Sequence, residues 1–73
     1  MDMNEFISIF KESLQIEDND IQPETKFKEL PLWDSMSVMS VIAMSDEHFS
    51  KEIDVDRLNE LDTIEELYNF LTD

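Results

Sequence analysis

Glycine is absent from this chain of 73 residues, and proline occurs only at Pro23 and Pro31. No segment alternates apolar and polar residues between turn signals, so a β-hairpin or a sheet has little support. Apolar residues recur instead at the spacing of amphipathic helices. We therefore expect an all-α fold.

The first helical segment is followed by a long connection. The apolar side of this helix consists of Met3, Phe6, Ile7, Phe10 and Leu14, and the helix ends before the polar cluster Glu17-Asp18-Asn19-Asp20. The connection covers about residues 15–33, which is long for a compact domain. Its apolar residues, which we expect to pack onto the helices, are Ile21, Phe27, Leu30, Leu32 and Trp33.

Three more helices complete the prediction. The second runs from about Asp34 to Phe49, with Asp34 as its N-cap. A short third helix covers about residues 55–61, and a fourth begins at Thr63, where Thr63 and Glu66 fit a capping box. The expected architecture is a small four-helix bundle, formed by residues 1–73 as a single domain, with a long loop between the first two helices.

The charge balance is strongly acidic. Aspartate and glutamate total 19 against 5 lysine and arginine residues, a formal net charge of −14. This argues against nucleic-acid binding and against docking on anionic membranes, both of which need basic residues. No apolar run approaches the roughly 20 residues of a membrane span, and no basic-then-apolar leader is evident. We expect a cytoplasmic monomer with no nucleic-acid or membrane partner.

Metal binding and self-contained catalysis have little support. A zinc site needs several nitrogen or sulfur ligands, but the chain has one histidine, His48, and no cysteine. A hydrolase triad needs serine and histidine in contact, whereas Ser35 and His48 lie about 20 Å apart along one predicted helix. The EF-hand positions one, three, five and twelve are matched by Asp18, Asp20, Gln22 and Glu29. The sixth position needs glycine for a sharp turn and is Pro23. We expect no metal ligand, no catalytic residue and no enzymatic activity.

The second predicted helix is apolar on two sides. Its core side combines Val38, Val41, Ile42, Ser45 and Phe49, while the nearly opposite side combines Met36, Met39 and Ala43 with Ser40, Asp46 and Glu47. Such a helix is either wholly buried or presents one side to a partner, and complete burial is hard in a small bundle. Methionine suits surfaces that serve several partners. Whether the methionines face a partner or fill the core stays open.

The segment Leu32-Trp33-Asp34-Ser35-Met36 places a hydroxyl in the first turn of that helix. Free backbone N–H groups and the positive end of the helix dipole would favour an anionic phosphate attached there. Taken alone, the local pattern favours the more common role of such a serine, that of a cap or first-turn residue.

Taken together, these features resemble the acyl carrier proteins, the small acidic four-helix carriers of fatty-acid and polyketide synthesis. The resemblance covers essentially the whole chain. Its elements are the amphipathic first helix, the long loop, the motif Asp34-Ser35-Met36, a second helix ending in Asp46-Glu47-His48-Phe49, the segment Glu52-Ile53-Asp54 and a closing helix opened by Thr63-Ile64.

The resemblance implies that Ser35, preceded by Asp34, is esterified by 4′-phosphopantetheine from coenzyme A through a Mg²⁺-dependent phosphopantetheinyl transferase. The arm would carry acyl groups as thioesters between enzymes of fatty-acid, polyketide or related lipid biosynthesis. Acyl-loading and acyl-transferring enzymes with basic patches would dock on Met36, Met39, Ala43, Asp46, Glu47 and Ile53. The acyl chain would be sheltered among Val38, Ile42, Phe49, Leu58, Leu61 and Tyr68.

Four positions depart from the family pattern. Leu32 stands where the family usually has glycine, and Ser37 and Ser40 stand where central fatty-acid carriers commonly have acidic residues. Ser45 occupies a core-facing position that usually holds a large aliphatic residue, and its hydroxyl can bond to the carbonyl four residues earlier. These departures favour a specialised carrier. Two alternatives stay open: an aminoacyl or peptidyl carrier of the same fold, and an acidic helical interaction module that is never modified.

Overall fold

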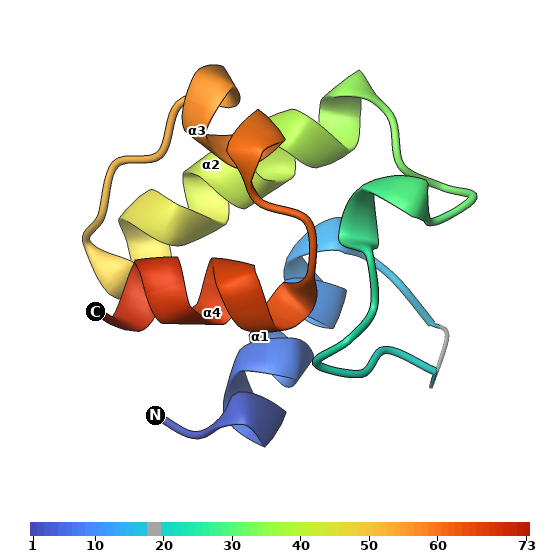
Figure 1. The fold of residues 1–73 in the computed structure, drawn as a ribbon, viewed down its shortest axis with the longest axis horizontal. Coiled ribbons are helices and arrows are strands. Elements are labelled where there is room, and N and C mark those ends of the chain that lie inside the picture. The colour runs from blue at the N-terminus through green and yellow to red at the C-terminus, as the bar shows by residue number, and fades with distance from the viewer. Residues whose placement is uncertain (18–19) are drawn as a thin grey trace.

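The computed structural model describes residues 1–17 and 20–73, which form four α-helices and one short 3₁₀ helix (Figure 1). The elements are α1 (Met3–Leu14), the 3₁₀ helix η1 (Phe27–Glu29), α2 (Ser35–Phe49), α3 (Val55–Glu60) and α4 (Ile64–Thr72). The expected all-α bundle with a long loop and a short third helix is confirmed. The EF-hand-like segment and the polar cluster at 17–20 both include Asp18, which lies outside the described residues.

Each α-helix begins at a side-chain cap. Asp34 and Thr63 cap α2 and α4 as predicted, and Asp2 and Asp54 cap α1 and α3. In α1 and α3 the capping carboxylates accept backbone N–H groups at 2.8 Å. These bonds satisfy donors that a helix start leaves without an intrahelical partner.

The C-terminal ends of α1 and α2 adopt a backbone conformation that glycine would adopt at a lower energy. Both helices stop at a residue in the left-handed conformation, Gln15 with φ 57° and Ser50 with φ 51°. This conformation costs a residue with a side chain roughly 1–2 kcal/mol, which is why helices usually end in glycine there. The fold therefore accepts a local backbone strain at two helix ends.

The core gathers side chains from all four helices and from the loop. Its fully buried members include Phe6, Phe10, Phe27, Met44, Leu58, Ile64 and Leu67. The Phe10 and Phe27 rings meet edge to face, with their centroids 6.1 Å apart, which joins the loop to α1. From α2 the core takes Val41, Met44 and Ser45. The Ser45 hydroxyl donates to the Val41 carbonyl at 2.8 Å, as its position on the core side allows.

Met44, which the sequence pattern did not single out, is almost fully buried and belongs to the core. Of the predicted core side, Val41 and Ser45 are buried, whereas Val38, Ile42 and Phe49 are only partly buried. The buried side is therefore rotated toward Met44, and both α1 and α4 contact α2.

The long loop runs along one side of the molecule from α1 to α2 and is tied to the start of α4 (Figure 1). The Ile64 N–H donates to the Thr25 carbonyl and the Glu65 N–H donates to the Pro23 carbonyl, both at 2.9 Å. These bonds use two N–H groups of the first turn of α4. The loop is thus part of the packed structure.

Four of the five apolar loop residues pack as expected. Ile21 and Phe27 are buried, and Leu30 and Trp33 lie partly buried against the core. The prediction was wrong for Leu32, whose side chain is 42% exposed. The next residue, Trp33, packs its ring on Phe27 instead, with the ring centroids 5.3 Å apart.

Candidate functional site

The start of α2 is held by a reciprocal capping box. The Ser37 N–H donates to the Asp34 carboxylate at 3.0 Å, and the Asp34 N–H donates to the Ser37 hydroxyl at 3.4 Å. The Ser37 hydroxyl also lies 3.3 Å from the same carboxylate oxygen and 3.5 Å from the Leu32 carbonyl. Ser37 is buried, so this network fixes the path of the chain into the helix.

Ser35 is the first residue of α2, and its side chain is exposed. The first turn of the helix contains no acidic residue. Among the described residues, no acceptor outside the helix takes up the N–H of Ser35 or of Met36. The exposed hydroxyl therefore stands beside two available donors at the positive end of a helix of 15 residues, a suitable place for a phosphate ester.

One face of α2 beyond Ser35 is open to solvent. Met36 is 73% and Met39 65% exposed, and Ala43, Asp46 and Glu47 are exposed as well. This answers the question that the sequence left open, because the core takes Met44 while Met36 and Met39 face outward. An apolar face rimmed by carboxylates is typical of a protein-interaction site.

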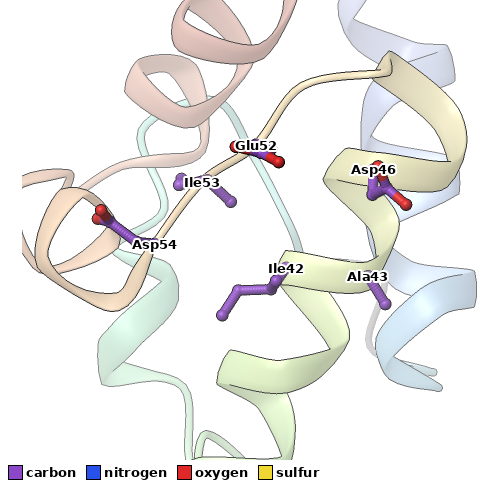
Figure 2. Close-up of a pocket in the computed structure, with 6 residues that line it drawn as sticks. All are labelled: Ile42, Ala43, Asp46, Glu52, Ile53 and Asp54. Atoms are coloured by element: carbon purple, nitrogen blue, oxygen red, sulfur yellow. The ribbon is translucent and has the colours of Figure 1, made fainter.

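Beside this face lies a groove of about 580 Å³, which we call the α2–α3 groove. Its lining residues are Ile42, Ala43, Asp46, Glu52, Ile53 and Asp54. Figure 2 shows the side chains of Ile42 and Ile53 turned toward one another between α2 and the segment that leads to α3. Half of the lining residues are acidic, so the groove combines an apolar floor with a negative rim.

Ile53 differs from the other residues predicted to bind partners. Its side chain is only 4% exposed, because it forms part of the floor of the α2–α3 groove and of the core. Direct contact with a docked protein would reach it only through that groove.

The residues expected to shelter an acyl chain lie on α2, on α3 and its C-cap, and on α4. Leu58 is buried, and Val38, Ile42, Phe49, Leu61 and Tyr68 are partly buried against the core. The Phe6 ring lies 5.6 Å from the Phe49 ring and 5.4 Å from the Tyr68 ring, which joins two of these residues through α1. Of the six, Ile42 also lines the α2–α3 groove.

Two structural absences bear on the site. In the part of the chain that the structure describes, no group of three or more His, Cys, Asp or Glu residues could hold a metal ion. No helix among residues 1–17 and 20–73 is long and apolar enough to cross a membrane.

Comparison with models of protein families gave one decisive result. The model described as a phosphopantetheine attachment site matches residues 4–71, nearly the whole chain. The chain belongs to this family. It is a carrier that bears a covalent 4′-phosphopantetheine group, and the resemblance to acyl carrier proteins is confirmed. No curated protein and no solved structure matched the chain.

The residues at the start of α2 fit such a group. A phosphate needs positive potential and N–H donors, and the start of α2 supplies the helix dipole and the N–H groups of Ser35 and Met36. The Asp34 carboxylate is turned back onto Ser37, where it caps the helix. When bound, the arm supplies a thiol, which the chain itself lacks because it has no cysteine. Carriers of this family interact with modifying and acyl-handling enzymes.

Proposed function

We propose that Ser35 is the residue esterified by 4′-phosphopantetheine, and that this protein carries acyl groups as thioesters between enzymes of fatty-acid, polyketide or related lipid biosynthesis. The supporting observation is the position of Ser35, an exposed hydroxyl at the first residue of α2 with two available N–H donors beside it. The family match spans this position. A net charge of −14 favours a monomer through mutual repulsion, and the proposed location is the cytoplasm.

The proposed docking surface for the partner enzymes is the open face of α2 with the α2–α3 groove. Met36 and Met39 offer apolar contacts in the first turns of α2, Ala43 offers another farther along, and Asp46 and Glu47 offer carboxylates beyond it. Basic residues on a phosphopantetheinyl transferase or an acyl-transferring enzyme would steer toward those carboxylates and speed the encounter. Ile53 would contribute from the floor of the groove.

The proposed shelter for the acyl chain is the interior lined by the inner side of α2 together with α3 and α4. Partly buried residues such as Ile42 and Leu61 can separate with less loss of packing than a fully buried side chain. A chain that enters there should slow amide exchange in α2 and α3 compared with the protein that carries the arm alone. Hydrogen exchange of the two forms measures this, and equal exchange would place the acyl chain outside the bundle.

The first experiment is an intact mass measured before and after incubation with coenzyme A, Mg²⁺ and a promiscuous phosphopantetheinyl transferase. We expect one added phosphopantetheine in the parent protein and none in Ser35→Ala. Ser37→Ala is the matched control, because it removes a serine hydroxyl two residues away and keeps the attachment residue. Addition to Ser35→Ala would place the group on another residue.

A parent protein that gains no mass, under conditions that modify another carrier, would contradict the proposed function. The acidic interaction module that is never modified would then be favoured. Circular dichroism of Ser35→Ala completes the comparison, because an exposed first-turn serine should be replaceable without loss of the fold.

A further inference from the structure

A second groove, of about 290 Å³, lies between the end of α1 and the start of α2. It adjoins Ser35, because the residues on either side of Ser35 both line it. Met36 of this groove and Ala43 of the α2–α3 groove are seven residues apart, so the two grooves share one face of α2. We call it the α1–α2 groove and define it by Ser13, Gln15, Leu32, Asp34, Met36 and Ser40.

The α1–α2 groove is lined mostly by polar side chains, and most of these are uncharged. Ser13 and Gln15 line it from the end of α1, and Ser40 lines it from α2. Within residues 1–17 and 20–73, none of these three side chains makes a hydrogen bond to the protein. Their hydroxyl and carboxamide groups, which can both donate and accept, are therefore available to a ligand.

Asp34 adds a carboxylate to the groove. The Ser37 N–H donates to its Oδ1 atom at 3.0 Å, and the Ser37 hydroxyl lies 3.3 Å from the same oxygen. The Oδ2 atom is left to accept a hydrogen bond from a ligand, whereas a negatively charged ligand would be repelled. The groove thus favours an uncharged ligand that both donates and accepts hydrogen bonds.

The wall formed by the end of α1 is held in place. The Gln15 N–H donates to the Glu12 carbonyl at 3.3 Å, and the Ile16 N–H donates to the Lys11 carbonyl at 2.8 Å. The backbone that presents the Gln15 carboxamide is therefore fixed on both sides. A fixed backbone lowers the entropic cost of binding a ligand there.

We propose that the α1–α2 groove is a resting site for the pantetheine part of the arm on Ser35. This inference rests on the proposed attachment at Ser35. Beyond its phosphate the arm is uncharged, and it contains amide groups, a hydroxyl and methyl groups. The amides and the hydroxyl suit the free polar groups of Ser13, Gln15 and Ser40, and the methyl groups suit the side chains of Leu32 and Met36.

The α2–α3 groove suits this part of the arm less well. The polar side chains that line it are three carboxylates, which accept hydrogen bonds but donate none. The carbonyl groups of the arm would find no side-chain donor there, whereas Gln15 supplies one in the α1–α2 groove. The volume of about 290 Å³ is close to the lower limit of about 300 Å³ typical of small-molecule sites, which suits a thin chain that is bound weakly.

The experiment detects contacts between the arm and the protein by isotope-filtered NMR. The full chain is labelled with ¹³C and ¹⁵N, and the transferase adds an unlabelled arm from coenzyme A, so that filtered nuclear Overhauser effects arise only between the arm and the protein. We expect such contacts with the Leu32 methyl groups and with the Gln15 side-chain amide. The backbone amide signal of Gln15 should also shift between the unmodified and the modified protein.

Gln15→Ala is the test variant, and Gln22→Ala is its matched control. Gln22 is also an exposed glutamine, but it does not line the groove. We expect Gln15→Ala to lower the ratio of docked to free arm about twofold to tenfold, because one uncharged hydrogen bond is lost. The contacts with Leu32 should weaken accordingly, while Gln22→Ala should leave them unchanged. Circular dichroism of the unmodified variants checks that both keep the fold.

The outcomes separate this inference from the proposed function. A parent protein that is never modified overturns the proposed function and this inference with it. A modified parent whose arm makes no contact with the α1–α2 groove overturns this inference alone. Contacts confined to Ile42 and Ile53 do the same, since they would place the arm in the α2–α3 groove. Equal contacts in Gln15→Ala and in the parent would also overturn it.

Discussion

Two helices of this protein, α4 and α2, begin with a capping box, but the remaining N–H groups of their first turns differ in whether they have a partner. At α4, Thr63 and Glu66 form a capping box, and the loop carbonyls of Thr25 and Pro23 take up the next two N–H groups. At α2, Asp34 and Ser37 form the box, but in the described chain the N–H groups of Ser35 and Met36 find no acceptor outside their helix.

The placement of carboxylates follows the same division. The first turn of α4 contains Glu65 and Glu66, which use the helix dipole for the stability of the protein. The first turn of α2 contains none, although the chain is strongly acidic. The start of α4, whose N–H groups are bonded to the loop, contributes to the stability of the fold. The start of α2 keeps two N–H donors available for a ligand.

The largest expected change in stability comes from disrupting the capping box at the start of α4. Thr63→Ala removes the hydroxyl that accepts the Glu66 N–H at 3.2 Å. We expect a loss of about 1–2 kcal/mol in the free energy of unfolding, the usual cost of an N-cap threonine. Urea denaturation at neutral pH measures it, with Thr72→Ala at the exposed far end of α4 as the control. A loss no larger than that of the control would show that the loop bonds alone hold the start of α4.

The box at α2 should respond less. Ser37→Ala removes hydroxyl contacts of 3.3–3.5 Å, which are longer than the bonds in the α4 box. Alanine also has the higher helix propensity, which offsets part of the loss. We expect a destabilisation of about 0.5–1 kcal/mol. Ser40→Ala, one turn later and outside the box, should change stability by less than about 0.5 kcal/mol. Equal losses for Ser37→Ala and Thr63→Ala would remove the distinction between the two starts.

The two boxes also differ in how well the sequence predicted them. Thr63 and Glu66 match a familiar four-residue pattern, and the N-cap role of Asp34 follows from its place before an apolar run. Nothing in the sequence marks Ser37 as the partner of Asp34, since glutamate or glutamine is the usual residue there. The short serine side chain works because Ser37 is buried against the loop, which is a tertiary effect.

The positions of the helices were predictable, whereas their packing was not. Helix positions follow from local spacing, so the predicted bounds of α1 and α2 agree with the structure. The rotation of α2 about its own axis does not follow from local spacing, because it depends on the packing of the helix against the other elements, which buries Met44 more than Ile42. Leu32 was predicted to pack on the helices but is exposed, and the neighbouring Trp33 packs on Phe27 instead. Ser13 and Gln15 at the end of α1 line one groove with Leu32 and Ser40 across the loop, and no local sequence pattern could reveal this.

Salt should raise the stability of the protein, because its net charge is −14. Screening weakens the repulsion among the many carboxylates of the protein. It also weakens the favourable interaction of Glu65 and Glu66 with the α4 dipole, but this involves only two residues, so the summed energy lost is smaller. We expect millimolar Mg²⁺ or physiological salt to raise Tm by a few degrees, about 0.5 kcal/mol. Asp46→Asn with Glu47→Gln should reduce this rise. A Tm that is the same with and without Mg²⁺ would contradict the expected repulsion.

The smallest effect concerns the acid limb of the stability curve. The pKa of Glu66 is lowered from its ordinary value, first by the Thr63 N–H at 2.9 Å and then by the Asp62 N–H at 3.0 Å, which donate to its carboxylate. A carboxylate whose pKa is lower in the folded state stabilises the fold fully above the ordinary glutamate pKa of about 4.3. This stabilisation is lost as the pH falls through the lowered folded-state pKa. Glu66→Gln keeps an acceptor oxygen but loses the charge, so the fall in unfolding free energy below about pH 5 should be shallower than in the parent. Glu65→Gln removes a charge from the same turn without touching the box. If both variants flatten the acid limb equally, charge in the first turn and not the closed box is what distinguishes α4 from α2.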